Sequence, residues 1–237
     1  MRTCQPRSWG PRHLLASLLL LGSLATISAG AAETAPLAAI PAAPEAPASP
    51  IAPEAPASPT LGVAAPNFSL VDLDGKRHSL TDFRGRTLVL EWINLDCPFV
   101  KNHYDSTGNL PALQRKAREE GTAWLTICSS APGKQGHFDE KILRQRLAAN
   151  GWAADAYLVD ADGAVGRRYA AKTTPHLFVI DAAGRLLYDG AIDSEPGTRP
   201  ESIAKARNHV APILQALQAE EEVEPRRTKP YGCSVKY

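Results

Sequence analysis

Residues 87–100 read TLVLEWINLDCPFV, and this stretch decides the fold. Four of its first six residues are apolar, which is typical of a strand in a parallel sheet that is buried on both faces. Cys97 and Pro98 follow shortly after it. Proline suits the first turn of a helix, because its missing N–H needs no partner there. The stretch therefore predicts a buried strand, a short loop and a helix that begins directly after a cysteine.

Strands and helices alternate on both sides of this stretch. An Asp-Gly pair predicts the turn of a hairpin before it. The order of elements predicts a mixed sheet with helices on both faces, which is an α/β fold. The expected elements are a hairpin at 68–73 and 77–80, a strand at 87–92, a helix at about 98–120, a strand at 123–128, a helix at 139–149, a strand at 156–159, a short helix ending at 169, a hairpin at 177–180 and 186–188, and a closing helix.

The closing helix is expected to begin with a capping box formed by Thr198 and Glu201 around Pro200. Its apolar residues recur on one helical face as far as Leu217. Pro212 lies within this span and removes one backbone hydrogen bond, so we expect a continuous helix with a kink.

Residues 1–31 have the order of a cleavable secretory signal. Arginines at positions 2, 7 and 12 precede the apolar run 14–27, and small residues follow it. The run is too short to span a bilayer comfortably. We therefore expect an exported protein, most simply periplasmic, with no membrane segment after cleavage. An uncleaved anchor is the alternative.

Residues 32–60 predict a spacer between the signal and the folded part. The octet APEAPASP occurs at 43–50 and again at 52–59. A segment of Ala, Pro, Glu and Ser lacks the side chains to bury a core, so we expect it to be disordered. We place one folded domain at 61–219 and a C-terminal tail at 220–237.

The charge balance argues against a nucleic-acid partner. The chain has 26 basic and 25 acidic residues, and cleavage of the signal would remove three of the basic ones. No basic cluster with interleaved aromatic residues occurs in the sequence. We expect no nucleic-acid binding.

Cys97 is the best candidate for a reactive group. It follows a buried strand and precedes a helix, so its thiol is expected at a helix N-terminus on the carboxyl side of the sheet. Unpaired N–H groups and the helix dipole favour the thiolate there, and the thiolate is the nucleophile. The alternative is an inert cysteine that is simply buried in the core.

Four motifs and the C-terminal sequence resemble the thioredoxin-like superfamily. They are APNF at 65–68, SLTDFRG at 79–85, Cys97-Pro98, TTPH at 173–176, and YGCSVKY at 231–237. The resemblance is greatest to the redoxin branch, which includes alkyl hydroperoxide reductases and thiol-specific antioxidant proteins, and YGCSVKY resembles the ending of an exported subgroup. It implies a thioredoxin-like fold. It also implies that Pro175 is a cis-proline that faces Cys97 and places the backbone of Thr174 beside it.

The chain departs from this family at two positions. Thioredoxins carry a second cysteine three residues after the first, and here that residue is Val100. Peroxiredoxins carry Thr or Ser three residues before the reactive cysteine, and here that residue is Asn94, which could still donate through its amide. A local pair of thiols is therefore excluded, and peroxidase activity stays one of two expectations.

A lone reactive thiol needs a second thiol to reset it. Cys233 on the tail is the favoured resolving cysteine, because an extended tail can reach the site and Gly232 eases its approach. Cys128 ends a neighbouring strand and is the second possibility. An intermolecular or external thiol is the third. The contrasting interpretation is a purely structural disulfide between Cys97 and Cys233.

These observations lead to one hypothesis and two alternatives. We expect a peroxiredoxin-like oxidoreductase in which Cys97 attacks a peroxide or a protein disulfide, Cys233 resolves the product, and an external thiol restores both. The alternatives are a non-catalytic protein of the same fold and a thiol-disulfide reductase or isomerase for exported proteins. The histidines have no paired-ligand spacing, so we expect neither a metal nor another cofactor.

Overall fold

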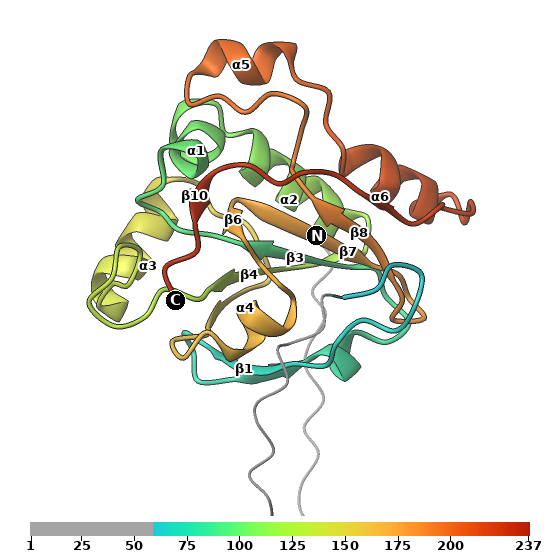
Figure 1. The fold of residues 1–237 in the computed structure, drawn as a ribbon, viewed down its shortest axis with the longest axis horizontal. Helices are drawn as coiled ribbons and strands as arrows, with labels where there is room; N and C mark the ends of the chain where they lie inside the picture. The colour runs from blue at the N-terminus through green and yellow to red at the C-terminus, as the bar shows by residue number, and fades with distance from the viewer. Residues whose placement is uncertain (1–58) are drawn as a thin grey trace, which may run out of the picture. The chain divides into compact units, whose positions relative to one another are not determined.

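The computed structural model describes residues 59–237, so the predicted signal and nearly all of the predicted spacer lie outside the described residues. Figure 1 shows a central sheet with helices around it. The strands are β1 (Ser69–Asp72), β2 (Arg77–Ser79), β3 (Leu88–Trp92), β4 (Ala123–Cys128), β5 (Ala156–Val159), β6 (Thr173–Thr174), β7 (His176–Ile180), β8 (Leu186–Gly190), β9 (Arg226–Arg227) and β10 (Cys233–Ser234). The helices are η1 (Leu80–Phe83), α1 (Pro98–Lys101), η2 (Asn102–Ser106), α2 (Asn109–Glu119), α3 (Glu140–Ala149), α4 (Ala164–Arg168), α5 (Pro200–Lys205) and α6 (Ala211–Gln218).

Eight strands of the described region form one mixed sheet in the order β2-β1-β5-β4-β3-β7-β8-β9. The strand that leads to Cys97, β3, pairs in parallel with β4 and antiparallel with β7. All five of its residues are buried, as the apolar run predicts. The remaining strands, β6 and β10, pair with each other. Cys97 therefore follows a strand at the centre of the sheet (Figure 1).

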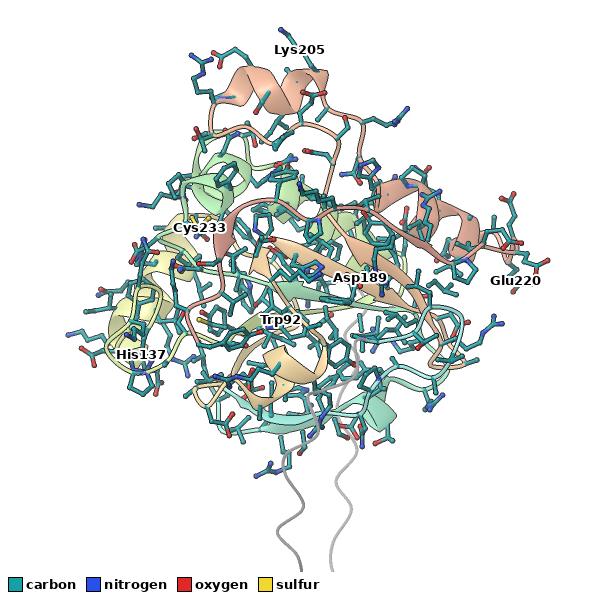
Figure 2. The ribbon with its side chains drawn as sticks, viewed as in Figure 1. Trp92, His137, Asp189, Lys205, Glu220 and Cys233 are labelled. Atoms are coloured by element: carbon teal, nitrogen blue, oxygen red, sulfur yellow. The ribbon has the colours of Figure 1, made fainter. Side chains whose placement is uncertain are left out.

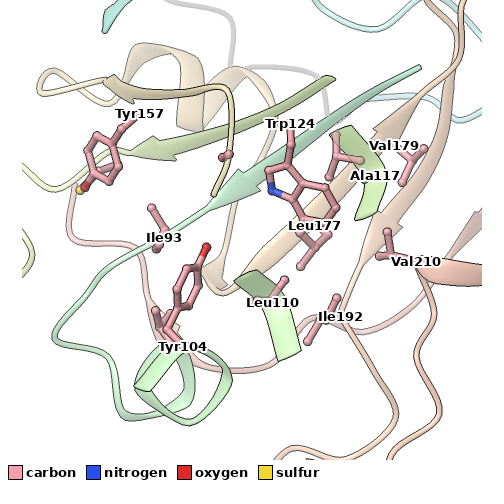
Figure 3. Packing of buried hydrophobic residues seen from close by; sticks show 14 of the residues in the cluster. Ile93, Tyr104, Leu110, Ala117, Trp124, Tyr157, Leu177, Val179, Ile192 and Val210 are labelled. Atoms are coloured by element: carbon pink, nitrogen blue, oxygen red, sulfur yellow. The ribbon is translucent and has the colours of Figure 1, made fainter. Parts of the chain in front are cut away.

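The sheet separates two apolar cores, because successive side chains of a strand point to opposite faces. Val89 and Trp124 face a core closed by α2, α3 and α6, and Figure 3 shows Trp124 with Leu110 of α2 in that core. Leu90 and Trp92 face the other core, which α4 and the N-terminal part of the domain cover. The predicted α/β architecture with helices on both faces is therefore confirmed.

The single helix predicted at 98–120 is wrong. The segment forms α1, then a π-helical turn, η2, and then a separate helix, α2. Gly108 precedes α2 with φ of 63°, a left-handed conformation that favours glycine and ends helical continuity. Pro111 lies in the first turn of α2, where it costs no intrahelical hydrogen bond.

The continuous closing helix is also wrong, because the segment forms two short helices. The first, α5, begins after Arg199 rather than Thr198 and has no side-chain cap. Between the helices, the Asn208 side chain accepts the N–H groups of Val210 and Ala211 at 2.8 and 2.7 Å. Pro212 is therefore in the first turn of α6, where it starts a helix and does not kink one.

None of the helices in residues 59–237 combines the length and the apolar composition needed to cross a bilayer.

Candidate active site

Cys97 lies at the junction of β3 and α1, as the sequence predicts. It is the N-cap of α1, and Pro98 is the first helical residue. Its side chain has no exposed surface. The thiol donates a hydrogen bond to the backbone oxygen of Thr174 at 3.0 Å. The Thr174–Pro175 peptide bond is cis, so the prediction made for Pro175 is confirmed.

The tail brings Cys233 to the same point. β10 pairs antiparallel with β6, and in this register Cys233 lies opposite Thr174. Figure 1 shows the red tail crossing the molecule beside β6, and Figure 2 labels Cys233 on it. Gly232 makes this approach possible, since a Cβ added there would lie 2.1 Å from the Thr174 oxygen. Its φ of 131° also favours glycine.

The two thiols interact with each other. Burial, together with the hydrogen bond and the charge interaction with Cys97, raises the pKa of Cys233 to about 11. Both cysteines are free thiols in the structure. A half-buried Cys233 with a raised pKa is neutral near pH 7.

Hydrogen bonds on both sides of Cys233 fasten the tail to the domain. Upstream, β9 pairs in parallel with β8, and the Thr228 N–H donates to the backbone oxygen of Asp189 at 3.1 Å. Downstream, the Val235 N–H donates to Lys172 O at 3.1 Å. The last residue, Tyr237, donates its hydroxyl to Ala171 O at 2.8 Å.

Tyr231 connects the tail to buried polar side chains. Its hydroxyl donates to Asp193 Oδ1 at 2.6 Å and lies 3.1 Å from His103 Nε2. Its ring packs against Phe99 of α1, with 5.8 Å between ring centroids. Burial and the neighbouring Asp193 carboxylate raise the pKa of Tyr231 well above its usual range, so the hydroxyl stays protonated and donates. These residues were not predicted from the sequence, although a tyrosine two positions before a tail cysteine was a usable signal.

Asn94 holds the loop before Cys97. Its Oδ1 accepts the Asp96 N–H at 2.9 Å, and its Nδ2 donates to Gln135 O at 3.2 Å. The amide thus ties the loop to the segment 129–136 that flanks the site. In the structure this amide bonds backbone groups, and the donation to a reacting atom that its residue type would allow is not seen.

Cys128 is not directed at Cys97 in the structure. It ends β4, as expected, but its thiol donates to Gly136 O at 3.4 Å. It also forms a side-chain hydrogen bond with Tyr157, whose pKa is raised mainly by burial. Among the described cysteines, the pair that the fold brings together is Cys97 and Cys233.

His176 follows the cis-proline and is held in one neutral form. The Lys172 N–H donates to its Nδ1 at 3.2 Å, so the ring hydrogen is on Nε2, which lies 2.7 Å from Asp189 Oδ1. Burial lowers the pKa of His176, which also favours the neutral ring. Arg227 of the tail bonds the other oxygen of Asp189 at 2.7 Å.

Glu91 was also not predicted from the sequence. It is fully buried in β3, and burial raises its pKa to about 7. Tyr104 donates to its Oε1 at 2.8 Å, while Gln114 and Trp124 donate to its Oε2 at 3.0 and 2.8 Å. An acid within an otherwise apolar strand was the signal that could have found it, because buried acids need such partners.

No group of three or more His, Cys, Asp or Glu side chains in residues 59–237 is arranged to hold a metal ion.

A cysteine at a helix start, facing a cis-proline beside a mixed sheet, defines the chain as a thioredoxin-like protein. A family model described as Redoxin matches residues 60–207, well over half of the sequence, and the chain belongs to this family. Both statements agree with the resemblance seen in the sequence.

Three relatives place the chain among known proteins. A hypothetical protein from Sinorhizobium meliloti 1021 is 26% identical with a TM-score of 0.63, covering 76% of this chain and 96% of its own. An uncharacterized conserved protein from Geobacillus kaustophilus is 27% identical with a TM-score of 0.61, covering 75% and 92%. The thiol-disulfide oxidoreductase ResA of Geobacillus thermodenitrificans is 25% identical over 126 residues, which are 53% of this chain and 66% of ResA. The chain thus spans just under two thirds of that relative.

Proposed function

We propose that the protein is a thiol-dependent oxidoreductase in which Cys97 is the nucleophile and Cys233 the resolving cysteine. The observation that carries this proposal is the pairing of β10 with β6, which sets Cys233 opposite Thr174, the residue whose carbonyl accepts the Cys97 thiol. Membership of the Redoxin family supports the same chemistry. Asn94, Pro98, Thr174 and Pro175 support the two cysteines by shaping the loop, the helix start and the facing strand.

With a peroxide as substrate, the reaction has three steps. The Cys97 thiolate attacks one peroxide oxygen, the O–O bond breaks, and Cys97 becomes a sulfenic acid while an alcohol or water leaves. The Cys233 thiol then attacks this sulfur, which forms the Cys97–Cys233 disulfide and releases water. An external dithiol reduces the disulfide and is itself oxidised. Each turnover thus passes two electrons from the external thiols to the peroxide.

With a protein disulfide as substrate, the same two cysteines act in the same order. Cys97 attacks one sulfur and forms a mixed disulfide, and Cys233 then displaces the substrate as a dithiol. The sequence relation to a protein named thiol-disulfide oxidoreductase favours this second substrate class. We also propose that the protein is exported to the periplasm, where a cysteine pair can cycle between its oxidised and reduced forms.

Paired assays on the purified protein test the proposal. Consumption of hydrogen peroxide and reduction of a disulfide-bonded protein are measured with a dithiol reductant, for the wild type and for Cys97→Ser, Cys233→Ser and Cys128→Ser. We expect Cys97→Ser to abolish turnover of the true substrate and Cys128→Ser to leave it nearly unchanged. Equal turnover by the wild type and Cys97→Ser in both assays would end the proposal.

The non-catalytic alternative makes a different prediction for the same cysteines. A structural Cys97–Cys233 disulfide should resist mild reductant and leave Cys97 inert toward alkylation. The proposed enzyme should instead be reduced readily and expose a Cys97 thiol that reacts with an alkylating reagent. Mass spectrometry of the alkylated protein at graded reductant concentrations distinguishes the two.

A further inference from the structure

We propose that Tyr231 is a positioning residue whose hydroxyl holds the tail closed over Cys97. Through this contact it governs how readily a bulky disulfide reaches Cys97 and how quickly Cys233 resolves the adduct. The second effect rests on the function proposed above. The first concerns only the opening of the tail.

The closed tail occupies the place that an extended substrate would take. Cys97 has no exposed surface, and β10 uses the backbone edge of Thr173 and Thr174 that lies beside it. A polypeptide that adds as a strand needs the same backbone groups, so it must first displace β10. Opening of the tail therefore precedes any reaction of Cys97 with a large partner.

The Tyr231 hydroxyl anchors the tail to a buried carboxylate two residues before Cys233. Asp193 is 3% exposed, and its Oδ2 has no hydrogen-bond partner among the described residues, although His103 Nε2 lies 4.0 Å from it. Its Oδ1 accepts the Tyr231 hydroxyl at 2.6 Å and the Glu195 N–H at 3.0 Å. A buried carboxylate with so few donors depends on each of them, because an unpaired buried charge is costly. Loss of the hydroxyl should thus weaken the closed state more than loss of a neutral contact.

Tyr231 is also well placed to direct Cys233. Both side chains pack against the core that includes Cys97 and Val100. The Tyr231 ring contacts Phe99, two residues after Cys97, so the anchor packs against the helical turn that begins at the reacting cysteine. When Cys97 carries an adduct, the tail loses its contact with the Cys97 thiol and must close again on the remaining anchors.

Tyr231→Phe keeps the ring and removes only the hydroxyl. Loss of one hydrogen bond to a charged partner changes an equilibrium constant by about tenfold. We expect tail opening to increase about tenfold, and closure onto an adduct of Cys97 to weaken by up to about tenfold. The variant should therefore speed attack on a bulky disulfide and slow resolution. A generally destabilised protein would not change these two steps in opposite directions.

An aromatic disulfide, 5,5′-dithiobis(2-nitrobenzoate), measures both steps on the full chain with Cys4 and Cys128 replaced by serine. With Cys233→Ser added, release of one thionitrobenzoate reports attack by Cys97. With Cys233 present, one of the two cysteines forms a mixed disulfide with the reagent. The other cysteine then attacks this mixed disulfide and releases a second thionitrobenzoate. Mass spectrometry of quenched samples identifies the Cys97 adduct. Deuterium exchange of the Val235 amide reports tail opening without any redox step.

Tyr169→Phe is the matched control. Tyr169 is also buried and also donates its hydroxyl, to Pro66 O at 2.5 Å, but it belongs to the core on the other face of the sheet. It should change neither release step nor Val235 exchange. If Tyr231→Phe leaves Val235 exchange and Cys97 attack at wild-type rates, the positioning role is refuted. If Val235 exchange rises in Tyr231→Phe but Cys97 of the wild type never reacts, the role of Tyr231 in holding the tail is supported and the proposed oxidoreductase function is refuted.

Discussion

Cys97 and Cys233 meet at one point of the molecule, but the segments that carry them are built differently. β3, which leads to Cys97, is buried along its whole length and has a paired strand on each side. β10, which carries Cys233, has two residues and, within the described region, one partner strand. The proposed nucleophile is thus fixed by the core, whereas the proposed resolving cysteine can leave when a few hydrogen bonds break.

This difference suits a cysteine pair that must separate and meet again in each cycle. One sulfur has to stay aligned with the cis-proline segment, and the other has to make room for a substrate. Many tail contacts involve backbone groups, whereas Tyr231 bonds a buried side chain two residues before Cys233. Three substitutions each change either the core around β3 or the C-terminal tail. They follow in order of the expected size of their effect.

The largest effect is expected in the core half, at Glu91. Its pKa is raised from 4.5 to about 7 in the folded protein. Between these values the folded state holds a proton that the unfolded state has released, so the free energy of unfolding falls as pH rises. Glu91→Gln keeps a neutral, hydrogen-bonding side chain and should remove this dependence, which amounts to about 3 kcal/mol.

Denaturant unfolding at pH 4.5 and pH 8, followed by tryptophan fluorescence, measures the effect. Relative to the wild type, the Glu91→Gln variant should be more stable at pH 8 than at pH 4.5, because only the wild type loses unfolding free energy between these pH values. Other titrating groups cancel in this difference. An equal difference at both pH values would contradict the raised pKa, because it would mean that Glu91 titrates alike in the folded and the unfolded protein.

A smaller effect is expected in the tail half, at Gly232. A Cβ there would clash with the Thr174 oxygen, and φ is 131°. A non-glycine residue in such a conformation costs about 1–3 kcal/mol. Gly232→Ala should therefore open the tail and raise the rate of Cys97 labelling by about ten- to a hundredfold. The rate is read by mass spectrometry after timed alkylation of the reduced protein.

Gly75→Ala provides the control for backbone strain alone. Gly75 has φ of 79°, in the turn between β1 and β2, and a Cβ there would meet no atom within 4 Å. This variant should lower the stability of the domain without changing Cys97 labelling. If both alanine variants accelerate labelling equally, global unfolding rather than tail opening exposes Cys97.

The fold could be predicted where a periodic or apolar run is long enough to specify an element. The strand at 123–128 was predicted to the residue, and the helix at 139–149 to within one residue. The break at Gly108 and the start of α6 at Ala211 were missed, because Gly108 was not considered as a break and Pro212 was interpreted as a kink within one helix. In both cases they mark the beginning of another.

The candidate site could be predicted where its residues belong to a motif. Cys97, Pro175 and Cys233 come together as expected, and the motifs at their positions were the signal. The two-residue strands β9 and β10 have no periodicity of their own, so only their partners define them. Tyr231 and His103 are 128 residues apart, and nothing in either local sequence indicates the other.

The smallest effect is expected from Tyr237→Phe, at the other end of the tail. The Tyr237 hydroxyl donates to a neutral backbone oxygen, that of Ala171, and its ring lies 4.5 Å from the Arg167 guanidinium carbon. Phenylalanine keeps the ring contact and loses one neutral hydrogen bond. This loss should raise the equilibrium constant for tail opening about threefold. Deuterium exchange of the Val235 amide measures it.

The comparison of Tyr237→Phe with Tyr231→Phe locates the stronger anchor. Tyr231 precedes Cys233 in the sequence and donates to a buried carboxylate, whereas Tyr237 follows Cys233 and donates to a backbone oxygen. If the tail opens from its free end, Tyr237→Phe will accelerate Val235 exchange but leave attack at Cys97 unchanged, because Tyr231 still holds the segment that covers the sulfur. Equal acceleration of both readouts would mean that the tail opens as one unit, and that both tyrosines hold it closed.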